Sequence, residues 1–207
     1  MESNIAFTKS NLMAAQYSLE LSLKGFELLD KKRNVLVMNM MGFIDRAEEI
    51  QQKMGEIFKE AYEALQVANI TMGISSIGEI AQSIPETAGF DIITRSIMGV
   101  EIPEVKFERK SLNHFYSFYH TNSALDVALK KFQELKYLIY ELSEVEDSVY
   151  KLAMEVKRTT KRANALQNIQ IPKYKEIVKV ISEVLEEKER EEFFRLKVVK
   201  KKKDQTL

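Results

Sequence analysis

Residues 5–68 read IAFTKSNLMAAQYSLELSLKGFELLDKKRNVLVMNMMGFIDRAEEIQQKMGEIFKEAYEALQVA, and this stretch decides the fold. Apolar residues return at every seventh position from its first residue to its last, and Arg33 is the only polar member of the series. A second series, offset by three, is interrupted only by Thr8 and Ser22. Such a repeat makes a narrow apolar stripe that packs along another helix in a left-handed supercoil. We therefore predict one long helix, roughly 100 Å in length.

The C-terminal half of the chain carries the same spacing. Its two series consist of Leu125, Phe132, Ile139 and Ala153, and of Ala128, Leu135, Leu142, Val149, Val156 and Ala163. Glu146 and Thr160 interrupt the first series. The stripe breaks at Gln167 and Gln170 and resumes in the same phase after Pro172. We predict a second long helix with a kink or short break near residue 172, because proline removes a backbone donor.

The segment between the halves, residues 71–112, has a different texture. It holds four of the seven glycines and two of the three prolines. Residues 98–107 alternate apolar and polar side chains around Pro103, which predicts a short strand or hairpin. Two long helices joined in this way fold back on each other. The predicted fold is all-α, a long antiparallel two-helix left-handed coiled coil with a small irregular cap that contains a short β-hairpin. Its parts are residues 1–70, 71–114 and 115–207.

Composition limits the possible functions. The 31 Lys and Arg residues balance 31 Asp and Glu residues, so no overall field favours nucleic acid or an anionic membrane. The most apolar run, residues 35–44, includes Asn39 and is far shorter than the roughly 20 residues that a spanning helix needs. With no cysteine and no signal-peptide pattern at the N-terminus, the sequence predicts a cytosolic protein without membrane insertion.

Three blocks of sequence carry a family resemblance. They are Thr8–Leu12 with Lys24–Arg33, the central Ile97–Pro103, and Lys161–Leu166 followed by Ile171-Pro172 and Glu189–Lys197. In order and spacing these blocks resemble the D-subunit family of V-type rotary ATPases, over essentially the whole chain. A free-standing coiled-coil adaptor or chaperone is the alternative that heptads alone allow, but an adaptor has no reason to carry these blocks.

The resemblance implies a central shaft without a catalytic site, a cofactor or a metal. The paired terminal helices would enter a ring of alternating A and B subunits, which bind and cleave ATP. The cap end would bind the small F subunit of the rotor, and the base would dock on a funnel-shaped subunit above the membrane ring, on its cytoplasmic side. Because the shaft is asymmetric, each interface of the ring would meet a different face of it and so hold a different state.

The resemblance also suggests which residues contact partners. They are Met98, Gly99, Val100, Ile102 and Pro103 in the hairpin, Arg162 and Asn164 in the second helix, and Glu191, Glu192, Phe193, Phe194 and Arg195 near the C-terminus. Two adjacent aromatic residues on a helix cannot both face the same seam. One phenylalanine is therefore expected on the surface, where it could serve as a bearing contact.

Some features have more than one interpretation. His114 and His120 lie among aromatic residues, and their spacing favours packing over a metal site, because the Glu-x-x-His pattern is missing. Lys200–Lys203 form a solubilising tail or a site for an anionic partner. Arg33 has three interpretations: it fixes the register of the coiled coil, its charged end reaches out of the seam to solvent, or it has a functional role. The methionines at 38, 40 and 41 fill gaps in the core or form a contact surface.

Overall fold

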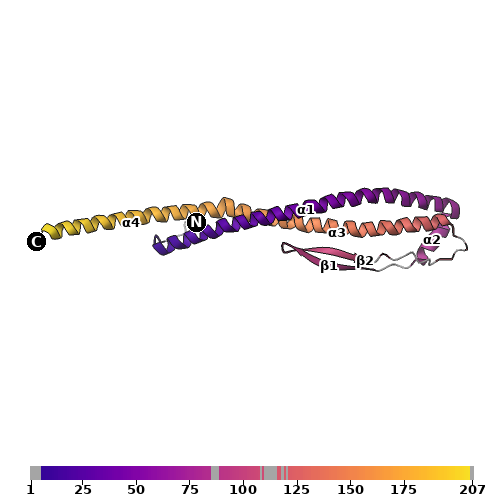
Figure 1. Ribbon diagram of the computed structural model, residues 1–207, viewed down its shortest axis with the longest axis horizontal. Coiled ribbons are helices and arrows are strands. Elements are labelled where there is room, and N and C mark those ends of the chain that lie inside the picture. The colour runs from indigo at the N-terminus through magenta and orange to yellow at the C-terminus, as the bar shows by residue number, and fades with distance from the viewer. Residues whose placement is uncertain are drawn as a thin grey trace. The chain divides into compact units, whose positions relative to one another are not determined.

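The computed structural model describes residues 6–84, 89–107, 109, 116, 117, 119 and 121–205. Its elements are α1 (Lys9–Met72), α2 (Ile74–Ser83), β1 (Phe90–Ile97), β2 (Val100–Phe107), α3 (Ser123–Ala165), the π-helical turn η1 (Leu166–Gln170) and α4 (Ile171–Gln205), as Figure 1 shows. This confirms the fold class that the heptad repeat predicted. The helix α2 was not expected, because its glycines and nearby proline suggested irregular structure.

The chain divides into two compact units. Val35–Val156 form one unit, and Met1–Asn34 together with Lys157–Leu207 form the other. In the first unit, Glu60 of α1 forms an ion pair of 2.6 Å with Lys131 of α3, and Leu36 packs with Leu152. Later positions in α1 thus meet earlier positions in α3, so the helices pair antiparallel within this unit.

The other unit has the same antiparallel pairing. Lys9, the first residue of α1, forms an ion pair of 2.8 Å with Glu189 of α4. Further along α1, Gly25 faces η1, because a methyl group on its Cα would lie 3.6 Å from Leu166 Cδ1. The Lys9–Glu189 contact raises the pKa of the lysine and lowers the pKa of the carboxyl group, chiefly through their hydrogen bond.

The N-terminal end of α1 explains part of a motif that carried the family resemblance. Thr8 caps the helix, because its Oγ1 accepts a hydrogen bond of 3.3 Å from the backbone N–H of Asn11. The side-chain amide of Asn11 donates back to the carbonyl oxygen of Ala6 at 2.6 Å. These contacts fix where the helix starts, so two residues of the motif have a local structural role.

The seam predicted for α1 is confirmed. Every position of the two heptad series from Leu12 to Ala68 is buried or half-buried. Its most deeply buried members are Ala15, Leu36, Ile50, Ala61 and Ala68. The exception to the apolar series, Arg33, is half-buried and forms an ion pair with Asp30 one turn earlier. A snorkelling side chain, one of the three interpretations offered, fits this geometry.

One of the two apolar series predicted for the middle of α3 is wrong by one residue, while the other, with Leu142, Val149 and Val156, is half-buried as predicted. Ile139 and Ala153 were placed inside, but both are exposed. The fully buried positions are instead Val145, Leu152 and Thr159, at the same spacing of seven. A straight α-helix drifts by about 20° per heptad, so a strict repeat loses contact with its partner unless the register slips. The shift also explains why the polar residues Glu146 and Thr160 interrupted the predicted series, because neither occupies a core position.

The turn η1 changes the register a second time. The N–H of Ile171 donates to the carbonyl oxygen of Leu166, five residues back, so this turn contains one residue more than an α-helical turn. Burial passes from Ala163 to Ile171, a step of eight, and continues at Ile181. The extra residue therefore offsets the slip in α3. The helix passes through Pro172 without ending, since the altered hydrogen bonding accommodates a residue that lacks an N–H.

The hairpin folds back along α3 within its unit. Ile102 of β2 is only 4% exposed and packs against Leu36 and Leu152. Near the open end of the hairpin, Phe107 stacks on Tyr137 with ring centroids 5.2 Å apart. Because Ile102 and Phe107 lie on opposite faces of the ribbon, the hairpin must twist strongly to bury both, as two-stranded ribbons do.

Candidate partner-contact surfaces

The tip of the hairpin is a tight two-residue turn. Met98 and Gly99 both have positive φ angles, 51° and 79°. This combination matches the twist of the flanking strands and is rare for a residue other than glycine, asparagine or aspartate. The Met98 side chain is 50% exposed. The turn thus presents a flexible apolar side chain at a fixed place, and both residues are accessible for the partner contact predicted from the sequence.

The other hairpin candidates have different surroundings. Val100 is half-buried and packs against the cluster of Leu36, Ile102 and Leu152. Pro103 is half-buried and faces Thr94 across the hairpin. Ile102 is buried within its own chain, so its side chain holds the hairpin in place. Their roles as contacts remain predictions.

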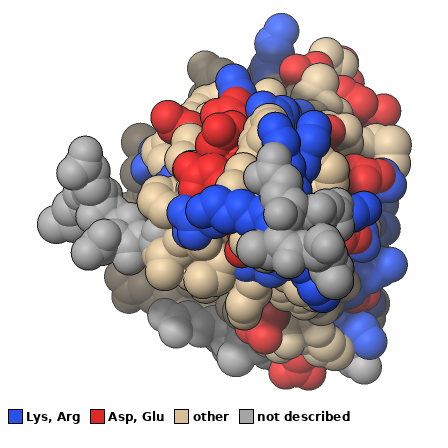
Figure 2. All heavy atoms as spheres, turned by 90° about the vertical axis from the view of Figure 1, so that its left-hand side faces the viewer, with Lys and Arg blue, Asp and Glu red and all other residues tan. Residues whose placement is uncertain are grey.

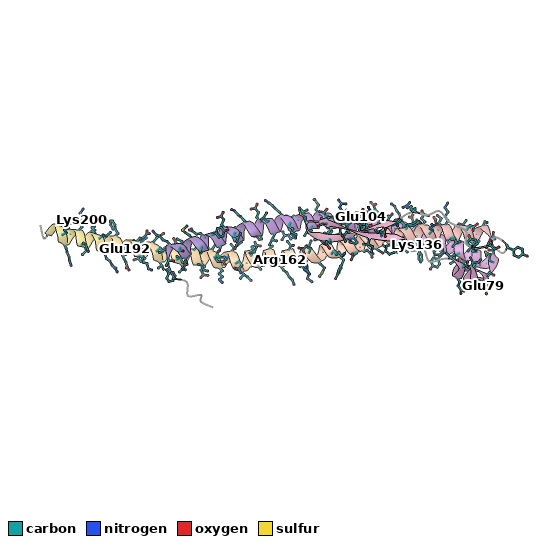
Figure 3. The ribbon with its side chains drawn as sticks, turned by 90° about the horizontal axis from the view of Figure 1, so that it is seen from below. Glu79, Glu104, Lys136, Arg162, Glu192 and Lys200 are labelled. Carbon is teal, nitrogen blue, oxygen red and sulfur yellow. The ribbon has the colours of Figure 1, made fainter. Side chains whose placement is uncertain are left out.

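A polar contact closes the outer edge of β2. Val105 donates its backbone N–H to Glu144 of α3 at 2.8 Å, so this strand edge is covered by the helix. Beside it lies an open groove of about 1140 Å³, lined by residues of both charges that include Arg46, Arg95 and Glu104. Glu104 is labelled in Figure 3. With both signs mixed along its wall, the groove is not suited to a strongly charged small ligand.

Arg162 and Asn164 lie on either side of the buried Ala163 and are both exposed. Arg162, which Figure 3 labels, is one of a group of basic residues on the surface of α3 and α4. The exposed members are Lys157, Arg158, Lys161, Arg162, Lys173 and Lys175. Within the described part of the chain none of these six has an ion pair. The surface therefore favours an acidic partner.

The C-terminal part of α4 is exposed on every side. Each described side chain from 186 to 203 is exposed, and Glu191 is bound to Arg195 by an ion pair of 3.6 Å. Phe193 and Phe194 are 67% and 63% exposed, so both phenylalanines, not one, are at the surface. With Leu196, Val198 and Val199 they lie around the whole circumference of two helical turns, since successive residues are about 100° apart. The exposed side chains of Arg195 and Lys197 lie between these residues, so charged groups interrupt the apolar surface.

Basic side chains follow directly on this apolar segment. Lys200–Lys203 are the last described side chains of α4. Figure 2 looks at the side of the molecule where α4 ends, and basic side chains gather there. The two predicted contacts before the phenylalanines, Glu191 and Glu192, are exposed on the preceding turn. The end of α4 therefore has an acidic, then apolar, then basic order.

One apolar region escaped the sequence analysis. Ile74 in α2 and Ile70 at the end of α1 are both 78% exposed, and Val67 is 52% exposed. Gly73, with φ 84° and ψ 146°, separates the two helices. The spacing of Ile74, Ile77 and Ile80 could have revealed an amphipathic helix, but the glycines and the nearby proline outweighed it.

The histidine and aromatic cluster is only partly described. His114 and His120 lie outside the described residues, so the choice between packing and metal binding is not tested. Tyr116 donates its hydroxyl proton to Asp126 in the first turn of α3 at 2.5 Å. Burial, and then this hydrogen bond, raise the pKa of Tyr116 to about 12. Across the ranges that the structure covers, no three His, Cys, Asp or Glu side chains gather in a way that could hold a metal ion.

Among the described helices, none is long and apolar enough to cross a bilayer. In comparisons with known proteins, residues 11–201 match the family model described as the D subunit of ATP synthase. The chain is 44% identical to the V-type ATP synthase D subunit of Thermotoga neapolitana over 96% of this chain and 98% of that protein. It is 39% identical to the A-type ATP synthase D subunit of Methanobrevibacter smithii, over 93% and 85% of the two chains.

A third relative, the A-type ATP synthase D subunit of Thermococcus sibiricus, is 36% identical over 93% of this chain and 92% of its own. The match to the family model includes all three blocks that carried the resemblance, except for the first residues of the N-terminal block. The family predicted from the sequence is confirmed, and the chain belongs to the D-subunit family of the V-type and A-type ATP synthases.

Proposed function

We propose that this chain is the central shaft of a V-type rotary ATPase or ATP synthase and has no catalytic site of its own. It passes torque between the ring of A and B subunits, where ATP is bound, and the ring in the membrane that moves protons or sodium ions. Its other partners are the small F subunit of the rotor and the funnel-shaped subunit above the membrane ring. It stays on the cytoplasmic side as a peripheral member of the complex.

The observation that carries this proposal is the end of α4. Phe193, Phe194 and Leu196 are all more than 60% exposed and point in different directions around one helix. A flat partner surface could cover only one side of such a segment. A collar formed by several subunits would cover all sides, and the weak, non-directional nature of apolar contacts allows the segment to turn inside it.

The two paired-helix units suit the transmission of torque. In each unit α1 is packed against an antiparallel helix, α3 in one unit and α4 in the other. A twist applied to one helix of the pair is therefore passed to the other. The ion pairs between the helices are exposed and therefore weak, and the seam of apolar residues carries most of the stability. The junction of α1 and α2, with exposed Ile70 and Ile74, is the surface we assign to the funnel-shaped subunit.

The proposal is tested by isolating the complex from native membranes through an affinity tag on this chain. We expect several copies each of A and B and one copy of F for each copy of this chain. In the same preparation, ATP hydrolysis should drive rotation of a bead attached to this chain while A and B are fixed to a surface. Recovery without a nucleotide-binding ring, or a ring that hydrolyses ATP without turning the bead, would overturn the proposal.

A further inference from the structure

The turn of the hairpin determines which backbone groups of β1 face outward. Because the turn contains only two residues, Ile97 and Val100 on either side of it form a hydrogen-bonded pair. Hydrogen-bonded and non-bonded pairs then alternate along the ladder. The N–H and C=O groups of Ile92, Thr94 and Ser96 belong to non-bonded pairs. They therefore point away from β2, toward the outer edge of β1.

The outer edge of β2 is protected in two ways. By the same alternation, Pro103 and Val105 have their backbone nitrogens on that edge. Pro103 has no N–H to satisfy, and Val105 donates its N–H to Glu144 of α3 at 2.8 Å. A proline and a covering helix are two of the devices that keep a strand edge from pairing with another chain. Both contacts also agree with the assignment of the edges.

The outer edge of β1 has neither device. The strand is eight residues long, contains no proline, and pairs with β2 without a bulge. Its side chains are exposed as far as Ser96, with Ile92 at 62% and Ile93 at 42%. Among the described residues the sheet has two strands, and no hydrogen bond reaches the outward-facing groups of this edge. A long, regular edge with exposed isoleucines is suited to pairing with another strand.

The charges on β1 indicate what such a strand would carry. Asp91 lies opposite Lys106 of β2, so it has an oppositely charged neighbour within the hairpin. Arg95 lies opposite the buried Ile102 and forms no ion pair with any described residue. Neighbouring strands place side chains of one face beside each other, and opposite charges there stabilise the pairing. A matching strand therefore has an acidic residue beside Arg95 and apolar residues beside the two isoleucines.

We propose that the outer edge of β1 receives an extended segment of another subunit of the complex, which pairs with it as a third strand and contains apolar residues and a carboxylate. The inference rests on the proposed function for the source of this segment, and adds to it a backbone contact that the transmission of torque does not require. A helix could cover the isoleucines. Only an extended chain can pair with the outward N–H and C=O groups of three alternate residues in a row.

A second copy of this chain is a poorer occupant. It would have to offer Asp91 to Arg95, although Asp91 already lies opposite Lys106. One pair of short strands also falls short of the roughly 1,200 Å² that stable complexes bury. A segment of another subunit does not need the full area, because the other contacts of the complex hold it near the hairpin.

Hydrogen exchange at single-residue resolution tests the inference in the complete complex, isolated through a tag on this chain. In the free chain, the outward amides of Ile92, Thr94 and Ser96 should exchange rapidly, while the ladder slows those of Ile93 and Arg95. In the complex we expect the three outward amides to exchange about tenfold more slowly or less rapidly still. Equal exchange of these amides in the free chain and in the complex overturns the inference.

A matched pair of proline variants identifies the edge. Thr94→Pro removes an outward N–H from β1 without removing a hydrogen bond of the hairpin, and should reduce the protection of Ile92 and Ser96 in the complex about two- to tenfold. Glu101→Pro removes an outward N–H from the edge of β2 and should leave that protection unchanged. Both free variants should melt like the wild type, because proline is tolerated at outward positions of an edge strand. Arg95→Gln leaves the backbone intact and should also reduce the protection, which keeps the test valid if a proline disturbs the hairpin.

A photoreactive side chain at Ile92 identifies the occupant. We expect it to crosslink to an extended segment of another subunit that contains an acidic residue. A crosslink to a helix, or to a second copy of this chain, overturns the inference. Failure of the wild-type chain to assemble with A and B would overturn the proposed function instead, whereas an assembled complex with unprotected outward amides overturns only the added strand.

Discussion

Single residues decide between two registers of the same helix. Leu152 has no exposed surface and packs with both α1 and the hairpin, while Ile139 is 45% exposed on the outside of α3. Replacing Leu152 by Ala removes buried methyl groups and leaves a cavity, so we expect a loss of about 2 to 5 kcal/mol in unfolding free energy. Ile139→Ala should cost less than about 1 kcal/mol. Urea unfolding followed by circular dichroism measures both, and equal losses would favour the strict heptad register.

The Tyr116 hydroxyl gives a pH-dependent contact at the start of α3. Its pKa is raised from 10.0 to about 12, so the folded chain holds this proton more tightly than the unfolded chain. The stabilisation is therefore fully present below about pH 10 and disappears as the pH rises to about 12. Among the eight tyrosines, we expect one to ionise late in an ultraviolet titration of phenolate. Tyr116→Phe should abolish that late step and Tyr17→Phe should retain it.

At the scale of elements, α1 could be predicted from sequence because its apolar series is almost unbroken and the structure follows it. In α3, Val145 and Glu146 stand side by side, and the pattern alone does not show that the seam has moved to Val145. This shift of the buried positions depends on how strongly α1 and α3 supercoil around each other. That is a property of the packed pair and cannot be read from the sequence of either helix. The extra residue at 166–170 is also hidden, since Gln167 and Gln170 look like a simple gap. The burial of Ile102 depends in the same way on packing between elements, so it could not be foreseen.

The turn η1 should tolerate the loss of one residue better than the α-helix around it. Deleting Asn168 converts the turn to a regular α-helical one and leaves the seam after Ala163 at a spacing of seven. Because Pro172 would then clash with the preceding turn, the deletion is combined with Pro172→Ala. We expect this variant to keep its helix content and nearly its melting temperature. Deleting the exposed Lys157, in regular α-helix, rotates all later side chains by about 100° and should lower the melting temperature sharply. If the two deletions lower the melting temperature equally, η1 does not accommodate the extra residue.

At the scale of the whole molecule, stability and function should separate at the end of α4. The packed seam continues through Ile181, but each described side chain from 186 to 203 is exposed. Cutting the chain after Lys188 removes exposed ion pairs such as that between Lys9 and Glu189, and surface ion pairs contribute little. The truncated chain should therefore melt like the full chain but fail to stay in the ring of A and B subunits under ATP hydrolysis.

Two full-length variants separate the apolar part of this segment from its basic end. Changing Phe193, Phe194 and Leu196 to Gln removes the side chains that point around the helix and should reproduce the truncation. Changing Lys200–Lys203 to Gln removes four positive charges and should alter retention only at low salt, where exposed charges act over longer distances. Retention is measured as the amount of this chain that remains with the ring after a fixed number of turnovers. If the lysine variant dissociates from the ring and the phenylalanine variant stays bound, the ring holds this end of α4 through its charges. The proposal that apolar contacts hold it would then be wrong.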